Sequence, residues 1–389
     1  MKPITICHII TRLDLGGSAE NTLLTAIGLR SRGYAVDLVC GRTDNPPSLN
    51  ERKALDCGVR IIRINELVRP IAPVHDARAF MRIIRLMREN RYDLVHTHTS
   101  KAGIVGRIAG AIAGVPIIVH TPHGHIFYGY FSSLLTVVFT GLERIVTKKT
   151  HALITLTNKE KQDYLARRIG DSARIHPILS GIDLSPFLKL KSPNDAFRAS
   201  IGLGPSDFVA GTVARLVSIK NHDGIVSAAS LLGNRCPNLR FVFVGDGELR
   251  LPLESRIRSL GLENRFVFLG WRNDIPECLA AFDLFVMCSH NEGMGRAFIE
   301  AQASGVPVIG SRVGGVEEAI AEGKTGFLVD PGKPEELTRV LERVYSDRDL
   351  LARMSAACRA HVDPAFSKEV MVDRINALYR SLMSEGKKP

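Results

Sequence analysis

Two glutamates beyond an apolar run have the type and spacing for ligand binding. Glu292 follows the run Leu284–Ser289, and Glu300 lies within the helix predicted to come next. The helix is predicted to begin near Gly293, where glycines leave backbone N–H groups open at its N-terminus, whose partial positive charge suits a diphosphate. We interpret the segment as a diphosphate site with a carboxylate for hydroxyl groups on either side; a capped helix with a solvent-exposed carboxylate is the alternative. The other candidate contacts of this segment are Gly293, Met294 and Gly295.

Two cations stand at a second predicted strand end. Arg215 closes the run Phe208–Arg215, and Lys220 follows five residues later. Charge-assisted hydrogen bonds from such cations to a diphosphate contribute roughly 1.5–3 kcal/mol each. Gly245 and Gly314 begin glycine turns after two further predicted strands. Each motif is weak alone, but all of them lie at strand ends, which favours one shared site.

The first half of the chain offers candidates for a second ligand. Gly16 and Gly17 lie between a predicted strand and a predicted helix, where glycines let the backbone approach a ligand. Asp14 precedes them as a candidate polar contact of an acceptor. Lys101 stands at the beginning of a predicted helix and suits an acceptor phosphate. An ordinary tight turn and an ordinary capped helix are the alternatives.

Histidines cluster at two further strand ends. A metal site needs three or four converging ligands, whereas His96 and His98 on one strand face supply two. We therefore expect no metal here, and we interpret His98 and His120 as buried supports. The members of the cluster are His96, His98, His120, His123 and His125.

Strand–helix alternation runs through the chain twice, which predicts parallel sheets with helices on both faces. We expect two Rossmann-like, doubly wound α/β domains, residues 1–185 and 195–365, facing across a cleft, with a C-terminal helix at about 366–389 packed back on the first. Ligands of such sheets bind beyond the carboxyl ends of the strands. Strands are predicted at 4–10, 35–40, 59–64, 93–98, 117–120, 152–157, 208–215, 239–245, 265–270, 284–289, 307–311 and 326–329.

The net charge of +11 belongs entirely to the first half. Residues 1–190 carry 26 Lys and Arg against 15 Asp and Glu, whereas residues 191–389 carry 25 of each. This asymmetry favours a polyanionic partner for the first half, and charge that only aids solubility is the alternative. The seven cysteines stand singly, and neither a secretory signal nor a membrane-spanning helix is evident, so we expect a cytoplasmic protein.

These motifs, with the segment Ala303–Ile309, resemble the family-4 retaining glycosyltransferases of the GT-B fold, of the type that builds bacterial polysaccharides. The likeness covers nearly the whole chain. It implies that Arg215 and Lys220 bind and stabilise the donor diphosphate, that Glu300 binds the ribose, and that Glu292 contacts the sugar. Gly-Met-Gly-Arg follows Glu292 where many members have a Phe-Gly pair, a departure at the sugar's surroundings.

In the first half, the resemblance places Gly16 and Gly17 against the donor phosphates and the acceptor, and His123 at the reacting sugar. It implies transfer from a nucleoside-diphosphate sugar, with UDP favoured, with retention and without a metal or other cofactor. A non-hydrolysing nucleotide-sugar epimerase is the alternative enzyme. A nucleic-acid-binding protein is the non-enzymatic alternative, although no nucleic-acid-binding motif supports it.

Two segments bear on the acceptor. Arg78, Arg82 and Arg85 are predicted on one helix face, and Ile126–Phe131 is aromatic. With the basic charge of the first half, they favour an anionic membrane surface and a lipid-linked or phosphorylated acceptor. We therefore expect a peripheral enzyme on the inner face of the cell membrane that extends a lipid-linked glycan for the cell envelope.

Overall fold

The computed structural model describes residues 3–14, 16–43, 48–124, 133–190 and 194–385. The chain divides into two compact units. Unit 1 comprises Met1–Gly181 and Lys368–Pro389, and unit 2 comprises Ile182–Ser367. None of the described helices is long and apolar enough to cross a bilayer.

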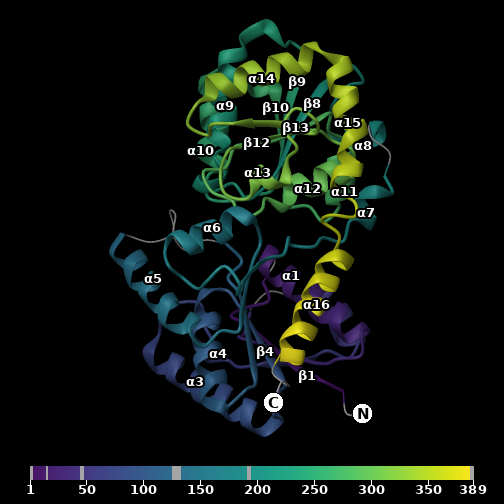
Figure 1. Ribbon diagram of the computed structural model, residues 1–389. Coiled ribbons are helices and arrows are strands. Elements are labelled where there is room, and N and C mark those ends of the chain that lie inside the picture. The colour runs from purple at the N-terminus through teal and green to yellow at the C-terminus, as the bar shows by residue number, and fades with distance from the viewer. Residues whose placement is uncertain (1–2, 15, 44–47, 125–132, 191–193, 386–389) are drawn as a thin grey trace. The chain divides into compact units, whose positions relative to one another are not determined.

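Unit 1 is built on a seven-stranded parallel sheet in the order β3-β2-β1-β4-β5-β6-β7, with helices on both faces (Figure 1). The strands are β1 (Thr5–Ile10), β2 (Ala35–Cys40), β3 (Arg60–Arg63), β4 (Leu94–His98), β5 (Ile117–Thr121), β6 (Ala152–Thr155) and β7 (Ile175–Pro177). The helices are α1 (Gly17–Ser31), α2 (Leu49–Asp56), α3 (Pro73–Asn90), α4 (Ser100–Ala113), α5 (Ser133–Thr147), α6 (Asn158–Ala166) and α16 (Lys368–Glu385).

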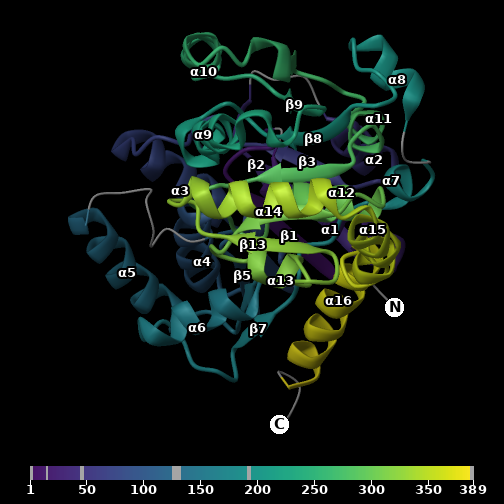
Figure 2. The same ribbon diagram turned by 90° about the horizontal axis from the view of Figure 1, so that it is seen from above.

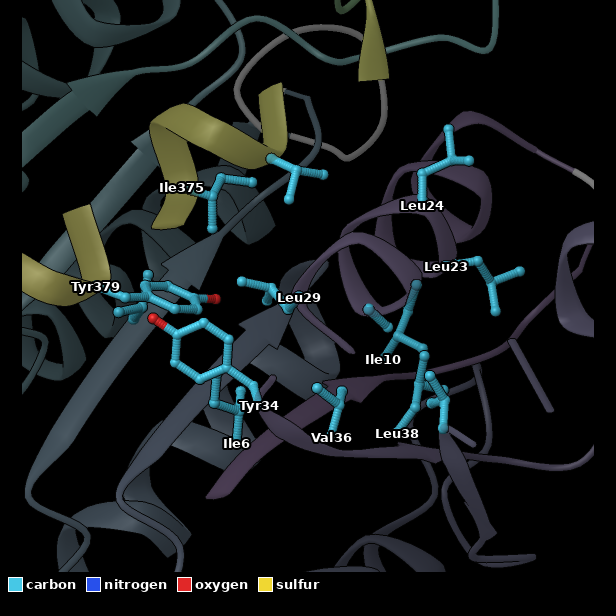
Figure 3. Packing of buried hydrophobic residues seen from close by; sticks show 14 of the residues in the cluster. Ile6, Ile10, Leu23, Leu24, Leu29, Tyr34, Val36, Leu38, Ile375 and Tyr379 are labelled. Carbon is cyan, nitrogen blue, oxygen red and sulfur yellow. The ribbon is translucent and has the colours of Figure 1, made fainter. Parts of the chain in front are cut away.

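Helix α16 completes the hydrophobic core of unit 1, although it is the last element of the chain. Ile375 and Tyr379 from α16 face Leu29 and Tyr34 (Figure 3), and all four are buried in one cluster. Gly28 of α1 allows this packing, because a Cβ there would stand 2.6 Å from Val372. Because α16 follows unit 2 in the chain, the core of unit 1 can be completed only after unit 2 has been synthesised.

Unit 2 is a six-stranded parallel sheet in the order β10-β9-β8-β11-β12-β13. Its strands are β8 (Phe208–Val213), β9 (Leu239–Val244), β10 (Phe266–Gly270), β11 (Leu284–Met287), β12 (Val308–Ser311) and β13 (Gly326–Val329). Its α-helices are α7 (Ser185–Leu188), α8 (Asp195–Ser200), α9 (His222–Leu232), α10 (Arg250–Ser259), α11 (Ile275–Ala280), α12 (Arg296–Ala303), α13 (Val316–Ala319), α14 (Pro334–Ser346) and α15 (Arg348–Val362).

The predicted fold class is confirmed, since both units are doubly wound parallel α/β structures. Buried strands read as continuous apolar runs, which is why the sequence located them well. Several short elements were missed, among them β7 and α2. Strand β7 has three residues and ends in Pro177, and α2 is mostly polar, so neither carries a strong periodic signal.

Each sheet has a point where the strand order reverses. In unit 1 it lies between β1 and β4, and in unit 2 between β8 and β11. Loops at the carboxyl ends of these strands diverge and leave room for a ligand. The candidate site residues follow these strands and their neighbours in the sheets.

Candidate active site

The loops after β8 and β11 of unit 2 bring Lys220 to Glu292. The Lys220 Nζ donates to Glu292 Oε1 at 2.5 Å, and the Ser289 hydroxyl donates to the same oxygen at 2.7 Å. The backbone N–H of His290 donates to the carbonyl of Ile219 at 2.8 Å, which ties the loops together. A cation and a carboxylate at the switch point thus offer one group for an anion and one for hydroxyls.

The glycine turn after β9 supports the loop that carries Arg215. Gly245 has φ 130°, and a Cβ there would stand 2.1 Å from the Ala214 carbonyl oxygen. The N–H of Leu216 donates to the carbonyl of Asp246 at 3.0 Å. Arg215 itself is exposed, and in the described part of the chain its guanidinium has no carboxylate partner. The close backbone contact requires glycine and leaves a cation available to a ligand.

A second glycine turn, after β12, packs on the backbone of Glu292. Gly314 has φ 52°, and a Cβ there would lie 1.8 Å from the Glu292 carbonyl oxygen. The N–H of Gly315 donates to that oxygen at 3.3 Å. The turn therefore fixes the position of Glu292 rather than contacting a ligand through a side chain.

Helix α12 begins at Arg296, so the sequence-based expectation that it begins near Gly293 is wrong. Gly295 caps the helix with φ 72°, a left-handed conformation that stops the helix from extending toward Gly293. Met294 is buried beside it. Within the helix, Arg296 Nε donates to Glu300 Oε1 at 2.6 Å. Glu300 thus has a cationic neighbour, Arg296. In the sequence, Arg296 was noted only as the last residue of the Gly-Met-Gly-Arg segment that departs from the family pattern.

In unit 1, the loop after β1 is open at its glycines. A Cβ on Gly16 or Gly17 would meet no heavy atom within 4 Å. Asp14 forms a 2.7 Å ion pair with Arg12 and accepts a hydrogen bond from the Thr43 hydroxyl. Open space beside this loop is compatible with a ligand, whereas Asp14 already has protein partners.

Lys101 is held by its own unit. Its ammonium pairs with Asp76 and donates to the Pro70 carbonyl. The side chain is 18% exposed. Binding an acceptor phosphate there would require Lys101 to leave or share these partners.

His123 ends a chain of hydrogen-bonded imidazoles. It follows β5 with a left-handed φ of 60°, and its Nε2 lies 2.8 Å from His98 Nδ1. The other nitrogen of His98, Nε2, lies 2.9 Å from His8 Nδ1. Burial lowers the pKa of His123 and of His8 to about 3, and places that of His98 well below 6.5. His123 is therefore a neutral hydrogen-bonding group at physiological pH.

The remaining histidines of the cluster support the strands. His96 lies 2.6 Å from the Tyr379 hydroxyl and 2.7 Å from that of Thr121. His120 Nδ1 lies 2.9 Å from the Thr97 hydroxyl, and His120 is fully buried. His125 lies outside the described residues.

Sequence reasoning missed His8, which the neighbouring strand β1 places against the cluster. His8, His96 and His98 hold ring nitrogens within 4.8 Å of one another. The expectation that only two histidines converge is therefore wrong, because strand pairing supplies the third. Hydrogen bonds engage five of their six ring nitrogens, and His8 Nε2 is buried without a partner in the described structure. A histidine inside an otherwise apolar strand was the available signal.

Two family models match the chain. Residues 15–186 match Glycosyltransferase Family 4, and residues 193–361 match the Glycosyl transferases group 1 model. A curated relative from Escherichia coli, UDP-Gal:alpha-D-GlcNAc-diphosphoundecaprenol alpha-1,3-galactosyltransferase, is 34% identical over 97% of this chain and 96% of its own length. The chain belongs to glycosyltransferase family 4. The resemblance inferred from the motifs is thereby confirmed, and the comparisons give the epimerase alternative no support.

Other matches extend over most of the glycosyltransferase. D-inositol 3-phosphate glycosyltransferase of Rhodococcus opacus is 30% identical over 94% of this chain and 86% of its own length. The crystal structure of Anabaena HepE in complex with UDP and glucose has a TM-score of 0.82 at 24% identity, covering 97% of this chain and 100% of that one. The lipopolysaccharide-biosynthesis glycosyltransferase WaaG has a TM-score of 0.74 at 19% identity, covering 96% and 99%. These likenesses show the GT-B fold.

Proposed function

We propose that this glycosyltransferase moves a sugar from a UDP-sugar to a lipid-diphosphate-linked glycan during synthesis of a cell-surface polysaccharide. The observation that carries the proposal is the pairing of Lys220 with Glu292 at the switch point of unit 2, in a loop pair that also presents Arg215. The Escherichia coli relative, whose name specifies UDP-galactose and a GlcNAc-diphosphoundecaprenol acceptor, supports the classes of donor and acceptor.

In the proposed reaction, Arg215 and Lys220 stabilise the charge that develops on the departing UDP diphosphate. Glu292 and Glu300 bind hydroxyl groups of the sugar and of the ribose. The acceptor hydroxyl attacks the face that the diphosphate leaves, and the leaving phosphate takes its proton, so the anomeric configuration is retained. Fixed cations replace a divalent metal in this scheme.

His123 serves as a neutral hydrogen-bonding group in the proposed reaction. Because burial keeps its imidazole neutral, it provides hydrogen bonding and no positive charge. We assign it to a sugar hydroxyl, held in place by the bond to His98. Gly16 and Gly17 admit the donor phosphates and the acceptor beside the loop after β1.

We further propose that the enzyme is peripheral on the cytoplasmic face of the membrane, where a lipid-linked acceptor resides, and that nucleic acid is not a partner. The arginines predicted to face this surface on α3 are exposed but partly neutralised. Arg82 pairs with Glu66 at 2.8 Å, and Arg85 pairs with Glu89 at 2.7 Å. The aromatic segment predicted to share this surface, Ile126–Phe131, lies outside the described residues.

The test is a panel of UDP-sugars incubated with GlcNAc-diphospho-lipid in detergent, followed by mass spectrometry of the lipid and NMR of the new linkage. We expect one added hexose or N-acetylhexosamine, stoichiometric UDP, and the donor's anomeric configuration in the product. Conversion of the UDP-sugar to its epimer without transfer would establish the epimerase instead. An inverted linkage would refute retention.

A further inference from the structure

Helix α5 exposes a row of aliphatic side chains and buries three polar ones, unlike a typical surface helix of a globular protein, although Val146 on its inner side is buried as well. Exposed aliphatic side chains occupy one face and are surrounded by few polar groups of the same helix. The buried polar residues are Thr140, Glu143 and Thr147. The exposed aliphatic residues are Val137 (69%), Val138 (51%), Leu142 (38%) and Ile145 (65%). We call these four residues the α5 outer face.

A buried ion pair fixes this orientation. Arg107 of α4 is fully buried, and its Nη2 donates to both carboxylate oxygens of Glu143, at 2.7 and 2.9 Å. Rotating α5 to bury its aliphatic side would separate the pair and leave an uncompensated charge inside the unit. The outer face is therefore held outward by the structure of unit 1. In both views α5 lies at the periphery of that unit (Figures 1 and 2).

Positive charge adjoins the outer face. Arg144 is exposed on α5, and Lys148 and Lys149 are exposed directly after the helix. Neither lysine has an ion-pair partner in the described part of the chain. Both line a cavity of about 700 Å³ whose described walls also contain one carboxylate, Glu385, and Arg174, which pairs with Asp171 at 3.3 Å. The cavity thus carries an excess of positive charge beside an apolar helix face.

We propose that the α5 outer face docks on an anionic lipid surface. The valines and Ile145 enter the boundary between headgroups and acyl chains, and Lys148 and Lys149 bind lipid phosphates at the C-terminal end of the helix. This combination of aliphatic area and neighbouring cations is complementary to an anionic bilayer. The inference rests on the proposed lipid-linked acceptor, which a surface-bound enzyme meets in the membrane.

The main test compares two matched pairs of substitutions in the full chain. Val137→Glu with Ile145→Glu charges the outer face, and Leu49→Glu with Leu55→Glu charges two aliphatic residues on α2 that are also more than half exposed. Sedimentation with phosphatidylglycerol-containing vesicles should weaken at least tenfold for the α5 pair and stay at the wild-type level for the α2 pair. Lys148→Glu with Lys149→Glu should lose binding by about fivefold or more per lysine and remove its salt dependence.

A tryptophan probe tests contact directly. The chain has one tryptophan, Trp271, in unit 2. In a Trp271→Phe background, Ile145→Trp should shift its emission to the blue on anionic vesicles and be quenched by brominated acyl chains. Leu55→Trp in the same background should show neither effect. Equal responses from both positions, or none from Ile145→Trp, would overturn the assignment of this face.

A transfer assay separates the two proposals. All variants should elongate a water-soluble, short-chain diphosphate acceptor at the wild-type rate, while the α5 pair loses activity on acceptor in vesicles. Normal elongation with no effect of the α5 pair on vesicle binding would refute the surface and leave the function standing. Vesicle binding that depends on α5, without transfer to any lipid-linked acceptor, would refute the function alone. If the wild type does not bind vesicles but forms a dimer that dissociates in the Val137→Glu, Ile145→Glu variant, a second copy of the chain covers the face.

Discussion

The two units share a doubly wound parallel plan, yet they place their polar side chains in opposite ways. Unit 1 encloses neutral imidazoles behind its strand ends, with His8, His96, His98 and His120 almost inaccessible to solvent. Unit 2 instead holds charged side chains, among them Lys220 and Glu292, in loops that are partly open. A neutral imidazole can be buried at modest cost when it is hydrogen-bonded, whereas a cation meant for a diphosphate must stay near water until the ligand arrives.

One architecture therefore serves two purposes. The imidazole chain of unit 1 gives a rigid, uncharged wall that positions His123. The glycine turns of unit 2 position charged groups through the backbone, as at Gly245 and Gly314.

Acidification should have the largest effect, because it should lower the free energy of unfolding of unit 1 more than that of unit 2. Burial lowers the pKa of His8 and His123 to about 3, below the unfolded value near 6.5, so the unfolded chain binds more protons between these values. Stability is present above pH 6.5 and is lost as the pH falls, by about 2 kcal/mol for each such histidine between pH 7 and pH 5. Unit 2 holds one buried histidine of this kind, His222, with its pKa lowered to about 4 by burial and by Lys220.

We therefore expect unit 1 to unfold first on acidification. Far-UV circular dichroism should therefore fall in two steps, the step at the higher pH belonging to unit 1. A single coincident transition would remove the contrast between the units.

Breaking the buried ion pair of unit 1 should have the next largest effect. Glu143→Ala strands Arg107 without a partner and should lower the free energy of unfolding by about 3–5 kcal/mol. Glu342→Ala in unit 2 removes an exposed partner of Arg235 and should change it by less than about 1 kcal/mol. Urea denaturation measures both. Equal losses would show that the Arg107–Glu143 pair does not fix α5.

Removing a donor-site charge should affect binding more than folding. Lys220→Ala should weaken UDP binding by about 1.5–3 kcal/mol, because a charge-assisted bond to the diphosphate disappears. Arg215→Ala and Glu300→Ala should weaken it as well. Isothermal titration calorimetry gives the values, with Lys324→Ala, an exposed lysine before β13, as the control. Unchanged affinity for UDP in all three variants would contradict the assignment of these residues to the donor site.

Metal removal should have no effect, the smallest of the expected outcomes. His8, His96 and His98 converge, but hydrogen bonds already engage five of their six ring nitrogens. Fixed cations of unit 2 serve the diphosphate in the proposed scheme. Transfer rates should therefore be equal with and without excess EDTA. Activity lost to EDTA and restored by Mn²⁺, Mg²⁺ or Zn²⁺ would contradict metal independence and give the histidines a different role.

Much of the fold was accessible to sequence reasoning because it depends on local signals. Buried parallel strands read as apolar runs, and glycines mark their ends, so β13 was located at its observed bounds. The helix after Glu292 was placed too early, because glycine permits a helix N-terminus at several positions and only the left-handed backbone of Gly295 decides among them.

The sequence by itself determined two doubly wound units and the strand-end loops that carry Arg215, Lys220 and Glu292, since periodicity and glycine turns act over a few residues. Tertiary structure alone decided which histidines meet, because the pairing of β1 with β4 joins His8 to His98. It also decided which side of α5 faces outward. Periodicity reveals that a helix has two different faces, but the buried partner of Glu143 on another helix determines which of them is solvent-exposed.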